Sequence, residues 1–231
     1  MDTKDIINRL SVLGAKYHAV QNDLSKKYQF DQLRDVRINV FRHCSIVVDS
    51  TYIIFLVRKQ HLFDDPWWTN LMDNNLVSRK MTQEQRNIFL YGFDTFVDSS
   101  YITMLFVAVE SAFRSFYLSA FSKDVPIKIY DVFKELLEEF NLDRYSKLLK
   151  LFRLIRNSYH SNGKHTSNDA DVPWRDKTYH FKKGQQVELG GVWKTFIIIT
   201  EDILEMLKEL VMSDAILQKT EIIDVTYNNL S

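Results

Sequence analysis

Four polar side chains near the end of one predicted helix are suited to act on a phosphodiester. Arg153, Arg156, Asn157 and His160 fall on one arc when the segment is wound at about 100° per residue, and Gly163 ends the helix just beyond them. Arginine offers a planar fork of donors to phosphate oxygens, and histidine exchanges a proton near neutral pH. An amide at this position can orient either the substrate or the imidazole. The group therefore predicts general acid–base chemistry on an anionic substrate.

Positive charge is concentrated around these residues, although the whole chain carries 30 Lys and Arg against 30 Asp and Glu. Between positions 141 and 183 there are ten basic and four acidic residues, so this segment has a net charge of +6 and the rest has −6. Such a distribution is typical of a surface that binds an anionic ligand. Lys150, Lys164 and His165 lie in this segment and are predicted to bind the substrate.

The same residues also have a structural interpretation. Arginine and histidine on a helix flank are usually solvated or paired with an acid, and Glu110 is one candidate partner for Arg153 and Arg156. His160 can interact with the dipole at the helix C-terminus. Spacing alone favours this structural interpretation over the catalytic one.

The elements that must position this group are predicted to be helices. Six glycines and three prolines among 231 residues leave few turns, so long elements are expected. Apolar residues recur every three or four positions along most of the chain. A capping box at Thr82 and Gln85 opens one helix, Pro126 suits the first turn of another, and Asp143 can cap a third. Helices are expected at about 6–28, 33–62, 67–77, 82 onward, 96–121, 127–140, 143–160 and 192–212.

A small β-hairpin is expected between the last two of these helices. Positions 161–173 are polar and are predicted to form a loop. Tyr179 and Phe181 alternate with polar residues, a turn signal follows at 182–185, and Val187 and Leu189 alternate beyond it. The predicted fold class is therefore all-α, a helical bundle with an inserted hairpin near 177–189. One compact domain is expected, with N-terminal helices at 1–95, a core at 96–213 and a tail at 214–231.

The segment from Arg156 to Gly163, Arg-Asn-Ser-Tyr-His-Ser-Asn-Gly, resembles the signature of the HEPN superfamily (higher eukaryotes and prokaryotes nucleotide-binding), in particular a prokaryotic subgroup with an RNSxHxNG-type motif. Glu110 and Arg114 resemble the charged helix residues that support the motif in related proteins. The resemblance covers about 96–213 and implies a mostly helical domain. The family usually has about four to six residues between its arginine and histidine. Here three residues separate Arg156 from His160, and six separate Arg153 from His160, so Arg153 is the alternative functional arginine.

The resemblance implies a metal-independent endoribonuclease of toxin or defence type. Arg156, with Arg153, would bind the scissile phosphate, His160 would act as general acid or base, and Asn157 would position the histidine or the phosphate. Family members dimerise around a composite cleft, so a homodimer that acts on RNA is expected, with an antitoxin or a nucleotidyltransferase as a further candidate partner. Other members are not catalytic. The alternative is a module that only binds RNA, nucleotides or a protein partner.

The remaining polar and aromatic groups predict no cofactor. The residues that carry metal-ligand atoms after the helix match no strong ligand spacing, so no metal is expected; these are His160, His165, Asp169, Asp171 and His180. Trp67 and Trp68 are predicted either to anchor a loop on the core or to stack a base. The chain has no glycine-rich phosphate loop, which argues against a P-loop nucleoside triphosphatase.

A soluble, cytoplasmic chain is expected. The single cysteine, Cys44, lies in an apolar stretch and is predicted to be a buried hydrophobe in a reducing compartment. The first residues lack the apolar core of a signal peptide. The most apolar runs, 46–57 and 101–109, are shorter than the roughly 20 residues of a membrane span, so no membrane contact is expected.

Overall fold

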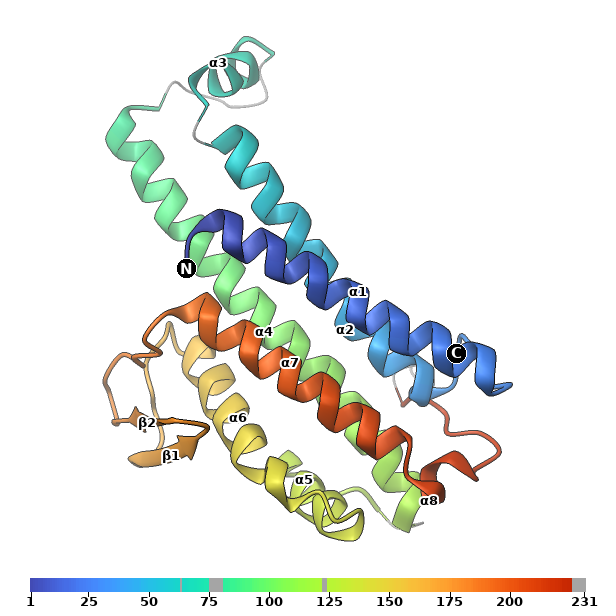
Figure 1. Cartoon of the computed structure of the whole chain (residues 1–231). Helices are drawn as coiled ribbons and strands as arrows, with labels where there is room; N and C mark the ends of the chain where they lie inside the picture. Colours follow the sequence, from blue (N-terminus) through green and yellow to red (C-terminus); the bar gives the residue numbers. More distant parts are fainter. Residues whose placement is uncertain (63, 75–80, 122–123, 226–231) are drawn as a thin grey trace.

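A computed structural model describes residues 1–62, 64–74, 81–121 and 124–225 of the chain. The chain is 71% helical and carries one small antiparallel hairpin, which confirms the predicted all-α class (Figure 1). The helices are α1 (Thr3–Lys27), α2 (Val36–Val57), α3 (Asp65–Asp73), α4 (Gln83–Phe121), α5 (Ile129–Glu139), α6 (Ser146–His160), α7 (Val192–Val211) and α8 (Asp214–Leu217). A π-helical turn, η1 (Arg58–Leu62), follows α2, a 3-10 turn, η2 (Asp143–Tyr145), precedes α6, and the strands are β1 (Ala170–Trp174) and β2 (Lys177–Phe181).

Helix α4 is the central element of the bundle. It packs against α2, α5, α6 and α7, and Figure 1 shows it running along the length of the molecule behind α7. Aromatic rings join these layers: Phe106 lies 5.1 Å from Phe152 of α6, and Tyr101 lies 5.9 Å from Phe196 of α7. One buried cluster contains residues of both expected segments, 1–95 and 96–213, and extends to Ile222.

The prediction of two helices between positions 82 and 121 was wrong, because α4 continues through both. The predicted capping box is confirmed at its start, where the Gln85 amide donates to the Thr82 hydroxyl at 3.2 Å and the Thr82 amide donates to the Gln85 side chain at 3.0 Å. Downstream no proline interrupts the sequence, and Gly92 has open space around it. Nothing local therefore stops the helix before Phe121.

The C-terminal end of α2 and the N-terminal end of α4 extend beyond the bundle as an arm, and η1 and α3 connect them at its tip (Figure 1). A small cluster of Leu62, Trp68 and Leu90 holds this arm together. The Trp68 indole N–H donates to the carbonyl oxygen of Leu62 at 3.1 Å, so Trp68 anchors this arm in a small cluster separate from the main core. Stacking of a base on the pair stays a prediction. The predicted helix at 67–77 ends as α3 at Asp73, and positions 75–77 lie outside the described residues.

The hairpin uses a different pairing from the predicted one. Strand β1 comes from the segment expected to be a loop, and it pairs with β2 so that Val172 lies opposite Tyr179. The two strands are joined by a turn at 175–176, where Arg175 has a positive φ of 54°. The predicted turn at 182–185 is also present, with the Gln185 amide donating to the Lys182 carbonyl oxygen at 3.0 Å, but it follows β2 instead of joining the strands. Val172 and Phe181 are buried on the side that faces the bundle. This apolar pattern selects β1 as the partner, because alternate side chains of a strand share one face.

Two predicted helix starts were also displaced. Helix α5 begins at Ile129, so Pro126 precedes the helix instead of occupying its first turn. Asp143 opens the 3-10 turn η2, and α6 has no side-chain cap at Tyr145. The last long helix, α7, matches the predicted range 192–212 within one residue.

A buried ion pair fastens the segment after α7, which was expected to be an irregular tail. Asp35 and Arg37 form a salt bridge of 2.5 Å at the start of α2, and both side chains are almost completely buried. The Arg37 guanidinium lies 3.6 Å above the Phe30 ring and donates to the carbonyl oxygens of Ile216 and Lys219. This contact orders the chain from α8 to position 225 against α2 and α4, while 226–231 lie outside the described residues.

Two stretches have the length and apolar composition of a membrane span, Val36–Leu62 and Gln83–Phe121. The prediction of no membrane span was based on the uninterrupted apolar runs 46–57 and 101–109. The two helices are longer than these runs, and each contains a mostly apolar stretch with few charged residues. Both helices also supply the core, with Phe41 and Phe113 completely buried, and core helices of soluble proteins meet the same criterion. The cytoplasmic location therefore stays a prediction.

Candidate functional site

The predicted polar arc on α6 has the expected orientation. The apolar stripe Leu148, Leu151, Phe152 and Ile155 is buried against the bundle. The opposite flank then carries the side chains that could do chemistry: Arg153, Arg156 and Asn157 are half-buried, and His160 is exposed. Helical periodicity therefore brings these four residues to one side of α6, at its C-terminal half.

The two guanidinium groups are held by aromatic rings and not by carboxylates. Arg156 lies 5.1 Å from the centre of the Phe106 ring and donates to the side-chain oxygen of Asn157 at 3.2 Å. Arg153 lies 5.4 Å from the centre of the Tyr130 ring. Among the described residues neither arginine forms an ion pair, and the Nε atoms of both are buried without a hydrogen-bond partner. Their positive charge is therefore available to an anion.

Glu110 does not pair with either of these arginines. It accepts two hydrogen bonds from Arg114, one turn further along α4, and the shorter is 2.8 Å. Arg114 in turn donates to the carbonyl oxygens of Pro126 and Ile127. The pair predicted to support the motif thus holds the connection between α4 and α5.

His160 is the last residue of α6 and lies at the surface. The chain turns immediately after it: Asn162 and Gly163 have positive φ angles of 53° and 79°, and the Gly163 amide donates to the Ser158 carbonyl oxygen at 2.9 Å. A Cβ atom at Gly163 would come within 2.4 Å of the Gln186 side chain. The predicted termination of the helix by Gly163 is therefore confirmed, with both a conformational and a steric reason.

The three predicted substrate-binding residues have different positions. Lys150 is half-buried on α6 and Lys164 is exposed just after it. His165 is only 1% exposed, its Nε2 lies 2.8 Å from the Asn168 carbonyl oxygen, and its ring packs on Phe181. A role in substrate binding does not fit His165, because its ring fastens the loop to the hairpin.

The remaining candidate chemistries find no site in the described part of the chain. His180 pairs with Asp171 across the hairpin at 2.8 Å, and no group of three His, Cys, Asp or Glu residues among the described positions could hold a metal ion. Cys44 is buried as predicted, and desolvation raises the pKa of its thiol to about 12. A thiol in that state is a poor nucleophile at neutral pH.

A hollow of about 780 Å³ lies beside the C-terminus of α6, and no sequence pattern predicted it. It lies between α4 and the loop that follows α6, with Phe96 and Asp98 on one side and Tyr159, Asn162 and Gly163 on the other. Phe96 is 65% exposed at its rim. Neither His160 nor the arginines of α6 line this hollow, whereas the carboxylates of Asp94 and Asp98 do, so it is not a site for the same anion.

Together, two guanidinium groups, one amide and one imidazole can bind an anion and exchange a proton with it. The arrangement comes from a single helix, so it is rigid within the subunit. Comparison with known proteins adds no assignment: the chain matches no protein-family model, no curated protein and no solved structure.

Proposed function

We propose that the chain is a metal-independent endoribonuclease of toxin or defence type. In this proposal Arg156 and Arg153 bind and neutralise the phosphate at the cleaved bond. His160 acts as general acid or base while the ribose 2′-hydroxyl attacks the phosphorus. Asn157, which already contacts Arg156, positions that guanidinium toward the phosphate.

One observation carries this proposal. The two guanidinium groups have no acidic partner among the described residues, and they lie on the same side of α6 as an exposed imidazole. Packing over Phe106 and Tyr130 orients them without neutralising their charge. Structural arginines in partly buried positions usually have a carboxylate partner, so this pattern favours an external anion.

A homodimer is part of the proposal, and an apolar stripe on α4 supports it. Phe96, Met104 and Val107 are 65%, 54% and 44% exposed, and they follow the helical period along the solvent side of α4, turned away from Phe106, which contacts α6. The exposed part of such a stripe is on the order of the several hundred Å² that a dimer buries per partner. A second copy packed there would give the assembly a second set of the same arginines.

A non-catalytic RNA- or nucleotide-binding module is the second candidate. It is favoured by the surroundings of His160, since no side chain among the described residues hydrogen-bonds to its ring. Catalytic histidines are usually oriented by a second group. In this alternative the arginines bind the anion and no proton is transferred.

Cleavage of a mixed RNA pool in the presence of a metal chelator tests the proposal. His160→Ala and Arg156→Ala are each expected to lower the cleavage rate by about 100-fold or more, because a general acid–base group typically contributes about 10²–10⁴-fold. Arg153→Ala, run alongside, shows which arginine serves. His180→Ala and Arg9→Ala are matched surface controls and should leave the rate unchanged.

Binding of the same RNA distinguishes the two candidates. If the wild-type chain binds RNA without cleaving it, and Arg153→Ala and Arg156→Ala weaken binding, the non-catalytic module is correct. If the wild-type chain neither binds nor cleaves RNA as a dimer, both candidates are wrong.

A further inference from the structure

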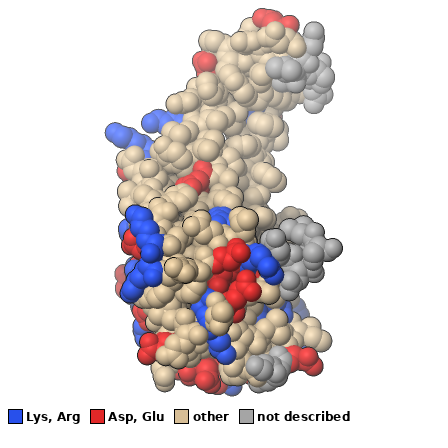
Figure 2. All heavy atoms as spheres, turned by 90° about the vertical axis from the view of Figure 1, so that its right-hand side faces the viewer, with Lys and Arg blue, Asp and Glu red and all other residues tan. Residues whose placement is uncertain are grey.

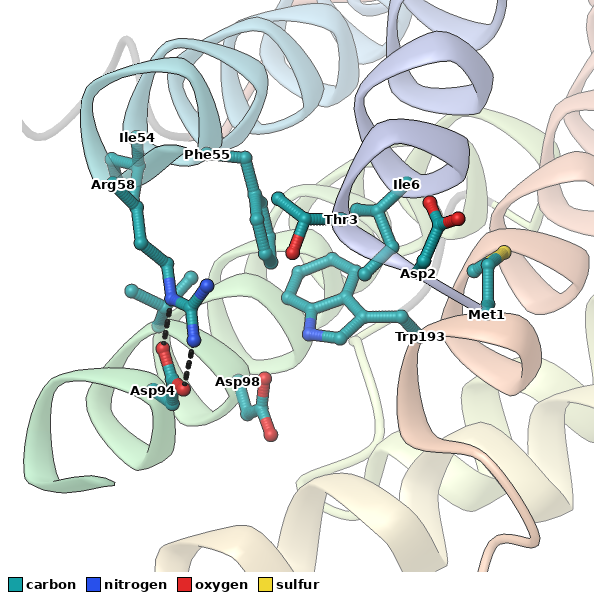
Figure 3. Close-up of a pocket in the computed structure, with 11 residues that line it drawn as sticks. Met1, Asp2, Thr3, Ile6, Ile54, Phe55, Arg58, Asp94, Asp98 and Trp193 are labelled. Atoms are coloured by element: carbon teal, nitrogen blue, oxygen red, sulfur yellow. Dashed lines mark hydrogen bonds and ion pairs between the residues drawn. The ribbon is translucent and has the colours of Figure 1, made fainter. Parts of the chain in front are cut away.

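A cavity of about 350 Å³ lies where four helices meet, away from the arginine face of α6 (Figure 3). Its walls come from the start of α1, the end of α2, the first half of α4 and the start of α7. The rings of Phe55 and Trp193 form an aromatic wall, edge to face with their centres 4.8 Å apart. The volume is within the range of about 300–1,000 Å³ that is typical of small-molecule sites.

Three carboxylates line this cavity, those of Asp2, Asp94 and Asp98. Asp2 accepts from the Asp5 amide at the start of α1, and a guanidinium neutralises Asp94. Arg58 donates from Nε and Nη2 to the two oxygens of Asp94 at 2.6 and 2.7 Å, as the dashed lines in Figure 3 show. Asp98, one turn further along α4, forms no ion pair with any described residue, and the Trp193 indole lies near it. The cavity therefore holds a partly buried carboxylate without a counter-ion.

The groups around the cavity exclude two classes of ligand. An anion would meet the negative charge of Asp98, and the guanidinium of Arg58 is already engaged by Asp94. Calcium and magnesium ions prefer several oxygen ligands, and no group of three candidate ligands occurs in the described ranges. An organic cation fits, because it pairs with one carboxylate and is attracted to aromatic rings.

We propose that this cavity binds a small organic cation, an alkylammonium or guanidinium compound, with Asp98 as its counter-ion and Trp193 and Phe55 as its aromatic wall. The site uses none of the residues assigned to the cleavage of RNA, although Asp94 and Asp98 also line the hollow beside the C-terminus of α6. Bound there, the cation would bridge α1, α2, α4 and α7.

The protonation of Asp98 gives the site a pH dependence. Burial is the main cause that raises the pKa of Asp98 to about 7, and the charge of Asp94 raises it further, while Trp193 and Arg58 act in the opposite direction. The ionisable groups that line the cavity or act on Asp98 from neighbouring elements are the Met1 amino group, Asp2, Arg58, Asp94 and Tyr159. A cation stabilises the ionised carboxylate, so it should bind more tightly as the pH rises through this value.

Calorimetric titration of the purified chain with choline and with agmatine tests the proposal. At least one of them is expected to bind with a dissociation constant of about 1 mM or lower at pH 8, and about ten-fold more weakly at pH 6, because the ionised fraction of Asp98 falls about ten-fold. The neutral isostere of choline, in which carbon replaces nitrogen, should not bind. In the NMR spectrum, the indole N–H signal of Trp193 should shift on binding.

Asp98→Asn is expected to reduce the affinity for the cation at least about ten-fold. Glu188→Gln, which removes an exposed carboxylate elsewhere, should bind as the wild-type chain does. The proposal is overturned if neither cation binds at pH 8, or if Asp98→Asn binds as tightly as the wild type. Should Asp98→Asn fail to fold, equal affinity of the wild type at pH 6 and pH 8 overturns it instead. RNA cleavage is not part of the readout, so the ribonuclease proposal can fail without affecting this result.

Discussion

At the residue scale, Asp98 shows how packing sets the charge of one side chain. An aspartate in water has an ordinary pKa of 3.8, whereas burial raises the pKa of Asp98 to about 7. Between pH 3.8 and about pH 7, the Asp98 carboxyl keeps its proton in the folded protein, whereas it has lost that proton in the unfolded chain. Stability from this group is therefore present at low pH and is lost as the pH rises through about 7.

Asp98→Asn should remove this pH-dependent loss of stability, because an amide does not ionise. The free energy of unfolding of the variant, relative to that of the wild type, is expected to increase by about 2 kcal/mol from pH 4 to pH 8, after allowance for partial solvent exposure. Urea unfolding at several pH values measures the difference. Glu188→Gln serves as the control for the loss of one carboxylate, and a difference that does not change with pH would contradict the interpretation.

Other residues show the same dependence on surroundings. His165 and His160 are five positions apart, yet one is buried in a loop contact and the other is exposed at the helix end. Arg156 and Arg37 are both close to aromatic rings, but only Arg37 has a carboxylate partner. Residue type alone therefore does not distinguish a ligand-binding side chain from a structural one.

At the scale of elements, α2 and the C-terminal segment depend on a single buried arginine. Arg37 bridges Asp35, the end of α8 and the turn at 219–220, which are about 180 positions away in the sequence. Removing one partner of a buried ion pair leaves an uncompensated charge, which is much more costly than removing both.

Arg37→Leu is expected to lower the free energy of unfolding by about 3–5 kcal/mol, because Asp35 would stay buried without a partner. The double variant Arg37→Leu with Asp35→Asn should recover part of this loss. Urea unfolding measures both variants, and limited proteolysis should cut Arg37→Leu faster near 218–221. A loss below about 1 kcal/mol would show that the clamp contributes little.

At the scale of the whole molecule, exposed apolar side chains are found along the long helices α2 and α4. Figure 2 shows that the upper part of the face at the right of Figure 1 carries few charged side chains. Ile53 and Val57 of α2 are 58% and 41% exposed, and α4 carries its own exposed apolar stripe at Phe96, Met104 and Val107. Uncovered apolar surface of this size favours association with a partner.

The proposed dimer predicts the effect of a charge on the α4 stripe. Met104→Glu and Val107→Glu are expected to weaken self-association by at least about 100-fold, because each would bury a carboxylate in the interface. Light scattering after size exclusion, over a range of concentrations, measures the change. Val12→Glu places the same charge on an exposed valine of α1 and is the control. A wild-type chain that stays monomeric at high concentration contradicts the dimer.

Much of the helical architecture could be predicted from the sequence, because it depends on local order. The apolar period predicted α1, α2, α6 and α7 with small errors at their ends, and the capping box at Thr82 and Gln85 marked the start of α4. The arc of α6 that carries Arg153, Arg156, Asn157 and His160 followed from the same period. Each of these features involves residues within one or two helical turns of one another.

The tertiary structure decided the features that depend on distant residues. It packed the hairpin against the bundle, where Val172 and Phe181 are buried, and it placed the arginines of α6 against the rings of Tyr130 and Phe106. It also assembled the Asp98 cavity from four helices and fastened the C-terminal segment through Arg37. By itself the sequence determined which residues share a helix face. Only the packing of those faces determined which charges are buried and which have partners, because burial and pairing arise between segments far apart in the chain.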